Sequence, residues 1–273
     1  MSEWKAFSVE VADGVARVTL TGPGKGNAMG PDFWQELPEI FAELDGDASV
    51  RSVVLTGAGK HFSFGLDLAA MAGTLAPVLA DDAKAAPRTE FLREIRRMQA
   101  SVTALAECSK PVIAAISGWC IGGGLDLIAA ADIRLASADA KFSLREAKVA
   151  IVADIGSLHR LPGIIGEGNL RELAFTAKDI DAARAERMGL VNEVFEDQEA
   201  VLAAAHAMAR EIADNPPLVV QGIKDVLEHR TSPAVTDGLR YVSTWNAAFL
   251  PSKDLTEAIT AVFQKRAPEF KGE

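Results

Sequence analysis

The stretch KPVIAAISGWCIGGGLDLIAAADIRLAS, residues 110–137, decides the fold of this chain. Residues 111–117 are apolar and contain β-branched side chains, which predicts a buried strand. A glycine-rich loop follows at 118–124, then an apolar helix at 125–131 and a second strand at 133–136. A strand that leads through a glycine-rich loop into a helix and on to another strand is typical of an α/β protein with a parallel sheet.

The same alternation extends toward the N-terminus. Residues 7–11 and 15–20 alternate in polarity around Asp13-Gly14, a turn pair that predicts a β-hairpin. The further expected elements are a helix over 32–44, a buried strand over 50–56, a strand running into a turn and a helix start over 61–68, a loop or weak helix over 69–88, and an amphipathic helix over 90–107. We therefore expect an α/β core.

The C-terminal part is purely helical in its pattern. Helices are predicted over 199–214, 218–229, 235–249 and 254–266. The pattern divides the chain into an α/β core over residues 1–197 and a helical region over residues 198–273.

Composition limits the classes of function. The 273 residues are 49% hydrophobic and 24% charged, which is ordinary for a globular protein, and the net charge is −10. That charge disfavours binding to nucleic acid, which depends on Lys and Arg. Two cysteines make no disulfide framework, the N-terminal residues show no signal peptide, and no apolar stretch is long enough to span a membrane. Together with the alanine-rich composition, this predicts a soluble, cytoplasmic, bacterial protein.

Two glycine-containing loops, each at the end of a predicted strand, are suited to hold a ligand through backbone N–H groups. HFSFGLDL places Gly65 and Leu66 at a predicted strand end, and GWCIGGGLDL places three glycines, 122–124, ahead of a helix. Glycines let backbone N–H groups approach a ligand closely, and the helix N-terminus adds positive potential. Two N–H donors from separate loops form an oxyanion hole when they hold one oxygen. The alternative is that these glycines only let the helix pack on the strand.

Five stretches in order resemble the enoyl-CoA hydratase/isomerase (crotonase) family. They are HFSFGLDL, the 110–137 stretch, AKFSLREAKVAI, RLPGIIG and AFTAKDIDAARAERMGLVNEV, and the resemblance runs from about residue 7 to 265. It implies a crotonase-like (ClpP/crotonase) spiral of repeated ββα units, with a C-terminal helical region that builds trimers or dimers of trimers. It also implies an acyl-CoA substrate whose thioester carbonyl is held by the N–H groups of Leu66 and Gly123, with no metal and no cofactor beyond the coenzyme A of the substrate.

The resemblance also implies a set of substrate-contacting residues. These are Lys25, Ser63, Gly65, Leu66, Asp67, Leu68, Gly123 and Gly124.

Three acids distinguish this chain within the family. Asp126 stands just after the three glycines, Glu146 lies within AKFSLREAKVAI, and Asp154 follows shortly after that stretch. Hydratases of the family typically carry Glu at the first two positions and Gly at the third. An Asp–Glu–Asp set at these spacings instead resembles the Δ3,5-Δ2,4-dienoyl-CoA isomerases, as do the surrounding stretches GWCIGGG, VADIGSL and ELAFTAK. The expected function is therefore isomerisation of a dienoyl-CoA in fatty-acid β-oxidation.

The chemistry explains the extra acid. Conversion of a 3,5-diene to a 2,4-diene removes a proton at C2 and adds one at C6, and two acid/base groups reach both carbons more easily than one. By analogy with the hydratases, Glu146 serves C2, Asp154 serves C6 and Asp126 orients both, although the first two roles can be reversed. Each acid also has a structural alternative: a favourable first-turn charge for Asp126, a surface charge for Glu146 and a helix cap for Asp154.

Two rival functions remain open at this point. One is an enoyl-CoA hydratase, or another family enzyme that uses the same enolate. The other is an RNA-binding protein on the same fold, which the net charge of −10 and the intact acids disfavour.

Overall fold

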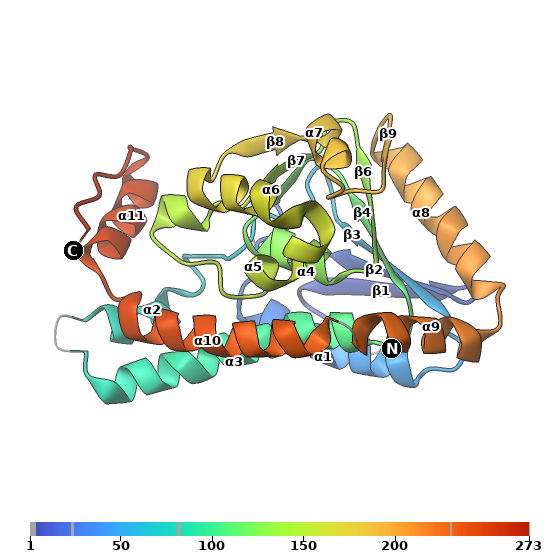
Figure 1. The fold of residues 1–273 in the computed structure, drawn as a ribbon, viewed down its shortest axis with the longest axis horizontal. Coiled ribbons are helices and arrows are strands. Elements are labelled where there is room, and N and C mark those ends of the chain that lie inside the picture. Colours follow the sequence, from blue (N-terminus) through green and yellow to red (C-terminus); the bar gives the residue numbers. More distant parts are fainter. Residues whose placement is uncertain (1–3, 23–24, 81–82, 230, 273) are drawn as a thin grey trace.

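A six-stranded sheet forms the centre of the protein (Figure 1). The computed structural model describes residues 4–22, 25–80, 83–229 and 231–272. The strand order is β1–β2–β3–β4–β6–β9, in which β1 and β2 are antiparallel and all other neighbours are parallel. The strands are β1 (Phe7–Ala12), β2 (Val15–Leu20), β3 (Ser52–Gly57), β4 (Val112–Ile116), β6 (Ile133–Ser137) and β9 (Glu193–Phe195). This arrangement confirms the predicted α/β class.

The predicted hairpin is present at the N-terminus. Asp13 and Gly14 both have positive φ, at 52° and 80°, which is the conformation of a two-residue type I′ turn. The turn sets the register of the two strands, so that Val9 lies opposite Val18.

A second, smaller sheet lies beside the first. Its order is β5 (Trp119–Ile121), β7 (Lys141–Ser143) and β8 (Asp179–Asp181). β5 falls inside the segment predicted to be a loop at 118–124, because Cys120 packs in the core and pairs with Phe142. Conversely, the strand predicted within 61–68 is reduced to isolated bridges, such as Ser63 with Cys120. The positive φ of Gly65, 78°, ends the extended conformation there.

Four helices of the core pack together through α3 (Ala85–Glu107), which contacts the other three. These are α1 (Pro31–Gly46), α2 (Ala72–Leu79) and α4 (Gly123–Ala130). Part of the segment predicted as a loop or weak helix is therefore helical, and α3 begins at Ala85, ahead of the predicted Glu90. Short elements follow: η1 (Glu146–Val149), α5 (Ser157–Arg160), α6 (Pro162–Thr176) and α7 (Ala182–Arg187).

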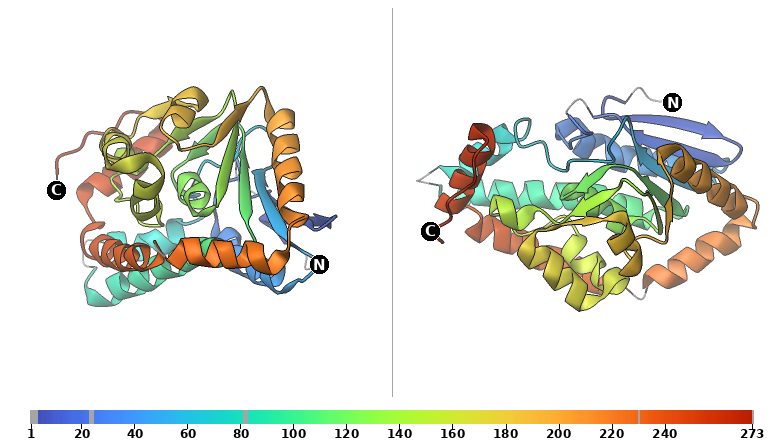
Figure 2. Two further views of the ribbon diagram at one scale, coloured as in Figure 1. Left: turned by 45° about the vertical axis from the view of Figure 1, so that its right-hand side comes forward. Right: turned by 90° about the horizontal axis from the view of Figure 1, so that it is seen from above.

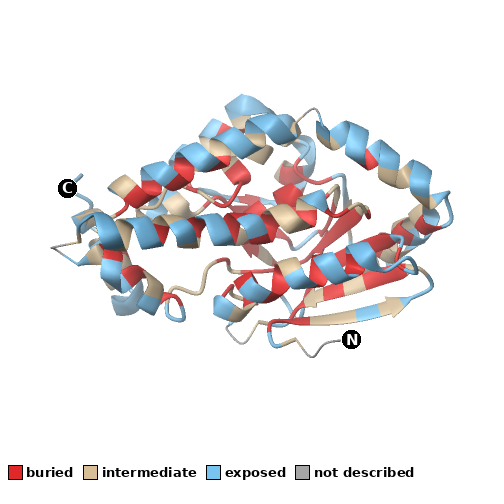
Figure 3. Cartoon of the chain, turned by 90° about the horizontal axis from the view of Figure 1, so that it is seen from below, coloured by how far each residue is buried: buried red, intermediate tan, exposed pale blue. Residues whose placement is uncertain are grey.

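The C-terminal helices are α8 (Gln198–Ala213), α9 (Pro217–His229), α10 (Ser232–Phe249) and α11 (Lys253–Gln264). α8 covers one face of the large sheet (Figure 2), where Val201 and Ala205 pack with Val54 and Ile113. α10 runs alongside α3 (Figure 1). α8, α10 and α11 each bury one side of the helix, whereas α9 has, among its described residues, a single buried one, Lys224, and the colours of Figure 3 show this mixture of buried and exposed positions along the helices. The division at residue 197 coincides with the N-cap of α8, and as a domain boundary it stays a prediction.

Among the described residues, no helix combines the length and the apolar character needed to cross a membrane.

Candidate active site

The two glycine-containing loops meet in space. A Cβ added to Gly65 would lie 2.7 Å from the carbonyl oxygen of Ile121 and 3.0 Å from the backbone nitrogen of Gly123. The loop of Gly65 is held by Met29, whose N–H donates to the Gly65 carbonyl at 2.8 Å and whose carbonyl accepts from Asp67 N–H at 3.0 Å. Only glycine permits this contact, because Gly65 has a φ of 78° and no space for a side chain.

The N–H groups that were predicted to hold the thioester carbonyl, those of Leu66 and Gly123, are free donors on the two loops. In the described part of the chain, neither group is among the backbone donors that bond to an acceptor. Gly123 is the first residue of α4, so its N–H carries the positive end of the helix dipole. The next donor back along the chain, Gly122 N–H, is occupied by the Ser143 carbonyl at 2.9 Å. Two unoccupied donors on adjoining loops are what the predicted oxyanion hole requires.

Most of the other predicted substrate-contacting residues shape these loops. The Ser63 hydroxyl is buried and donates to the Asn27 carbonyl at 2.9 Å, and it accepts from Gly65 N–H at 3.1 Å. The Asp67 carboxylate accepts from the N–H groups of the two residues at 69 and 70, closing the turn after the loop. Gly124 is buried, and a Cβ there would lie 3.3 Å from Cys120 Sγ.

The remaining two predicted residues differ in exposure. Leu68 is half-buried and packs against the core, and Lys25 is exposed, with no neighbour that fixes its side chain in the described chain.

Glu146 lies directly beside the oxyanion loop. It begins the turn η1, and a Cβ on Gly122 would lie 3.3 Å from its Oε1 atom. The residue as a whole is half-buried, but its Oε2 atom is buried and has no hydrogen-bond partner among the described residues. A buried, unpartnered carboxylate oxygen is costly for stability and is not a solvated surface charge.

Asp126 occupies the first turn of α4 and is 1% exposed. Its Oδ1 atom accepts a hydrogen bond from Ser157 N–H at 2.6 Å. This contact joins α4 to the first residue of α5 and fixes the segment that carries the third acid. Asp126 therefore does more than balance the helix dipole.

Asp154 is held by two side-chain amides. Its Oδ2 atom accepts from Asn246 Nδ2 of α10 at 2.6 Å, and its backbone carbonyl accepts from Gln99 Nε2 of α3 at 2.7 Å. Asp154 caps no helix in the described chain, since the N-cap of α5 is Gly156.

The three carboxyls form one electrostatic cluster. Burial raises the pKa of Glu146 to about 8, and the charges of Asp126 and Asp154 contribute to that rise. Burial raises the pKa of Asp154 to about 7, with the Asn246 hydrogen bond opposing the rise and the charge of Asp126 adding to it. Burial also raises the pKa of Asp126, opposed by the Ser157 hydrogen bond and by the charge of Arg160. Acids with pKa values near neutrality are suited to general acid/base work.

The pattern of the sequence did not reveal Asn246, Gln99 or Arg160 as parts of the site. Asn246 and Gln99 are polar residues on the buried, mostly apolar faces of their helices, and that exception to helical patterning is the available signal. Arg160 is held by Thr103 at 3.2 Å and leaves its Nη1 atom buried without a partner in the described chain.

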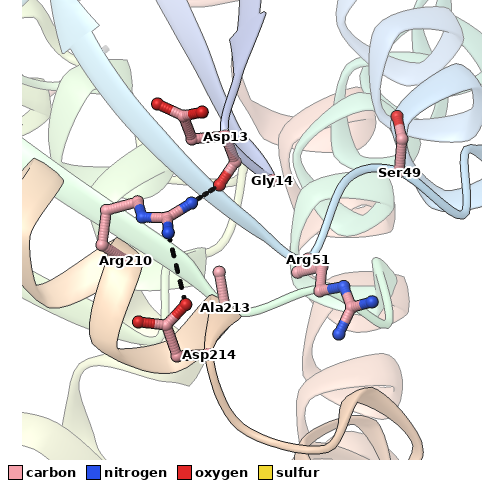
Figure 4. Close-up of a pocket in the computed structure, with 7 residues that line it drawn as sticks. All are labelled: Asp13, Gly14, Ser49, Arg51, Arg210, Ala213 and Asp214. Carbon is pink, nitrogen blue, oxygen red and sulfur yellow. Dashed lines mark hydrogen bonds and ion pairs between the residues drawn. The ribbon is translucent and has the colours of Figure 1, made fainter.

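A surface hollow elsewhere is unrelated to these acids. Figure 4 shows it between the β1–β2 turn and the end of α8, where Arg210 bonds the Asp13 carbonyl and Asp214. None of the predicted site residues lines it. Among the described residues, no group of three or more His, Cys, Asp or Glu side chains is arranged to hold a metal ion.

Comparison with known proteins identifies the family. Residues 10–273 match the family described as Enoyl-CoA hydratase/isomerase. The chain belongs to the enoyl-CoA hydratase/isomerase family. A crystal structure of an enoyl-CoA hydratase/isomerase from Xanthobacter autotrophicus Py2 superposes with a TM-score of 0.84 at 28% identity, over 96% of this chain and 94% of that one. The predicted crotonase fold is confirmed.

Two curated relatives within the family carry the activity that the three acids predicted. The mitochondrial Δ(3,5)-Δ(2,4)-dienoyl-CoA isomerase of Dictyostelium discoideum is 44% identical, over 99% of this chain and 93% of that protein. The peroxisomal Δ(3,5)-Δ(2,4)-dienoyl-CoA isomerase of Arabidopsis thaliana is 42% identical, over 94% of this chain and 92% of that protein.

The same relatives correct one prediction. They are enzymes of eukaryotic mitochondria and peroxisomes, so the expectation of a cytoplasmic bacterial protein is wrong. That expectation rested on alanine content and on the character of the N-terminal residues, and neither property is tied physically to one compartment.

Proposed function

We propose that this enzyme is a Δ3,5-Δ2,4-dienoyl-CoA isomerase of fatty-acid β-oxidation. The observation that carries the proposal is the cluster of three interacting carboxyls, Asp126, Glu146 and Asp154, beside two free N–H donors. The names of relatives at 44% and 42% identity support it. The coenzyme A belongs to the substrate, and the chemistry needs only proton transfers.

The reaction begins at C2. Ionised Glu146 removes the C2 proton, and the electron pair moves into the conjugated system to give a dienolate. Its negative charge lies on the thioester oxygen, where the N–H groups of Leu66 and Gly123 stabilise it. Protonated Asp154 then donates its proton to C6, which forms the 2,4-diene. Proton exchange with solvent returns Glu146 to its ionised form and Asp154 to its protonated form.

The position of Glu146 and the pKa values of Glu146 and Asp154 favour opposite assignments of the C2 base and the C6 acid. The 3.3 Å approach of Glu146 Oε1 to the Cβ position of Gly122, next to the proposed oxyanion donor of Gly123, supports a position near the carbonyl and so near C2. The pKa values, about 8 for Glu146 and about 7 for Asp154, favour the opposite proton distribution in the free enzyme. A difference of about one pKa unit costs only about 1.4 kcal/mol to reverse, whereas a carboxylate that does not reach C2 transfers nothing. We therefore assign the roles from position.

Asp126 is the orienting acid in this scheme. Its bond to Ser157 N–H fixes the segment that carries Asp154, and its charge raises the pKa of both partners. It shares no direct role in proton transfer.

A spectroscopic assay tests the activity. Purified enzyme is mixed with a 3,5-dienoyl-CoA, and the absorbance of the conjugated 2,4-dienoyl thioester is followed. We expect that absorbance to rise. An enzyme that instead hydrates a 2-enoyl-CoA and leaves the 3,5-diene unchanged is an enoyl-CoA hydratase, and the isomerase proposal then fails.

A homo-oligomer, a trimer or a dimer of trimers, is also part of the proposal. α9 attaches to its own chain through one buried residue, Lys224, and its apolar side chains face outward. At the end of α10 Leu250 is buried, whereas Phe249 and, on α11, Phe263 are exposed. The exposed apolar side chains on α9 and α10 are Leu218, Val219, Ile223, Val226, Leu227, Tyr241, Trp245 and Phe249. An apolar surface of this extent is typical of a subunit interface.

Light scattering tests the assembly. We expect a particle mass that is a multiple of three of the 28.9 kDa chain, and a lower mass when Val226 and Leu227 are both replaced by Glu. A monomeric wild-type protein would contradict the proposal.

A further inference from the structure

Asn246 reaches the acid cluster from a C-terminal helix. It lies near the C-terminal end of α10 with 0% of its surface exposed. Its Nδ2 atom donates to the Val152 carbonyl at 2.8 Å and to Asp154 Oδ2 at 2.6 Å. One side-chain amide thus fixes both the main chain and the carboxyl of the segment that carries the third acid.

The chemistry of the two acceptors sets the orientation of this amide. A backbone carbonyl only accepts hydrogen bonds, so the atom of Asn246 that faces Val152 must be its NH₂ group. The second hydrogen of that NH₂ group then serves Asp154 Oδ2. An oxygen that accepts from an amide N–H carries no proton of its own in that arrangement.

Asn246 also carries a cost for stability. Its Oδ1 atom is buried and has no hydrogen-bond partner in the described chain. A buried amide oxygen without a partner destabilises the folded state, which offsets part of what the two hydrogen bonds of Nδ2 contribute. The part of Asn246 that acts on Asp154 is therefore its NH₂ group.

Gln99 restrains the same segment from the opposite helix. Its Nε2 atom donates to the Asp154 backbone carbonyl at 2.7 Å and to the Leu239 carbonyl of α10 at 3.0 Å. Gln99 therefore ties α3, α10 and the Asp154 backbone together, and Asn246 sets the carboxyl on that fixed backbone.

We propose that Asn246 is a positioning residue for Asp154: it occupies Oδ2 as an acceptor, so that Asp154 carries and transfers its proton on Oδ1. The inference rests on the proposed isomerase function, in which Asp154 delivers a proton to C6. Because the Asn246 NH₂ group bonds Oδ2, only Oδ1 of the Asp154 carboxyl is left to carry the proton, and the carboxyl is held in one orientation.

The charged groups around Asp154 determine how its pKa responds when Asn246 is removed. Asp126 of α4 and Glu146 of η1 are the charged groups that interact with it, and both disfavour its ionised form. Arg160 of α5 acts on Asp126. The described parts of α3 and α10 that bond to Asp154 contribute neutral amides, Gln99 and Asn246. Loss of the Asn246 donor therefore raises the pKa of Asp154, because its side-chain hydrogen bond favours the carboxylate.

Two variants of similar size test the proposal. Asn246→Leu removes the donor, and Asn246→Asp replaces the donor with another acid. The matched control is Ser243→Ala, one turn earlier on the same buried face, whose hydroxyl bonds within α10 to the Arg240 carbonyl. Circular dichroism checks folding, and the Asp154 carboxyl is titrated by ¹³C NMR, with its signal assigned through Asp154→Asn.

The expected results separate positioning from a general loss of structure. In both Asn246 variants the Asp154 titration moves to higher pH, further in Asn246→Asp, and kcat falls about tenfold, the effect of one charge-assisted hydrogen bond. KM changes little, because Asn246 does not touch substrate. Ser243→Ala keeps the wild-type titration and kcat.

Specific outcomes overturn the inference. If the Asp154 titration in folded Asn246→Leu and Asn246→Asp coincides with that of the wild type, Asn246 does not position Asp154. The NMR titration needs no substrate, so an absence of isomerase activity in the wild-type enzyme refutes the proposed function and leaves the titration to decide on Asn246.

Discussion

Gly65 and Gly123 lie against each other, so closely that a Cβ on the first would stand 3.0 Å from the nitrogen of the second. Two loops that are far apart in sequence, with α2, α3 and β4 between them, therefore meet in space. The contact makes the spacing of the donors a property of the packing and not of a ligand, which is the preorganisation that stabilises a developing oxyanion.

Replacement of Gly123 by Val is expected to abolish thioester turnover in a folded protein. The new Cβ meets Met29 Sδ at 2.9 Å, the end of a flexible side chain that can shift, but the branched side chain occupies the carbonyl site. Loss of one oxyanion donor costs about 3–4 kcal/mol in transition-state stabilisation. The 2,4-dienoyl absorbance assay and a thermal melt measure the two effects. Gly168→Ala is the control, because its Cβ meets nothing within 4 Å, and unchanged turnover in folded Gly123→Val refutes the oxyanion assignment.

Asp154→Asn is expected to slow isomerisation by about 10²–10⁴-fold, the usual contribution of one general acid. The new side chain keeps an oxygen that accepts from Asn246, so the segment stays in place. The variant should still exchange the C2 proton of bound substrate with deuterated water, through Glu146, and Glu146→Gln should lose both activities. The exchange is read by mass spectrometry. C2 exchange that survives in Glu146→Gln and disappears in Asp154→Asn means that the two roles are reversed.

The pH profile of kcat/KM is expected to be bell-shaped, with limbs near pH 7 and pH 8. The reaction needs one ionised and one protonated carboxyl, and burial raises the pKa of Asp154 to about 7 and that of Glu146 to about 8. Below the first value both carboxyls hold a proton, and above the second neither does, so the rate falls on each side. A profile that is flat from about pH 5 to about pH 9 would show that these two groups do not titrate in the catalytic range.

Asp154→Asn is also expected to stabilise the protein at alkaline pH. The folded-state pKa of Asp154, about 7, lies above its ordinary value of 3.8, so the folded state loses stability as pH rises from about 4 through 7. The amide cannot ionise and escapes that loss, which amounts to at most about 4 kcal/mol. Urea unfolding at about pH 5 and about pH 9 measures it. A gain that is equal at both pH values would exclude the ionisation as its cause.

Lys224→Met is expected to lower the free energy of unfolding by about 3 kcal/mol. Lys224 Nζ donates to Asp132 Oδ2 at 2.8 Å and to the Lys110 carbonyl at 3.2 Å, and its loss leaves Asp132 partly buried without its cation. An exposed pair, Arg93 with Glu90, provides the comparison, because Arg93→Ala should cost less than about 1 kcal/mol. Equal effects of the two substitutions on the free energy of unfolding in urea would contradict a stabilising role of the buried Lys224–Asp132 pair.

Local patterning predicted most of the fold. The hairpin at Asp13-Gly14, the long helix α3 and the strand–loop–helix unit around α4 follow from alternation, helical spacing and turn chemistry, which act over a few residues. The strand β5 was missed, because it becomes a strand only through pairing with β7, which follows α4 and β6 in the chain. Pairing over such a distance leaves no periodic trace in so short a segment.

For the site, too, the sequence predicts the residues that stand in local motifs but not the contacts that long-range packing creates. The acids and the oxyanion glycines stand in recognisable motifs, whereas Asn246 is marked only as a polar residue on the buried face of its helix. Its role depends on α10 packing beside α3 and α5, and no residue near Asn246 in sequence records that packing. The bonds of Ser63 and Asp67 likewise arise from loop geometry, so the sequence could name these residues and not what they contact.

The bond between Asn246 and Asp154 also orders events in time. During synthesis, the three acids, the oxyanion loops and all strands of the large sheet leave the ribosome before α10 does. Until residue 246 has emerged and α10 has docked, Asp154 has no anchor for its carboxyl. A nascent chain therefore holds its complete set of acids before it holds the arrangement of them that Asn246 fixes.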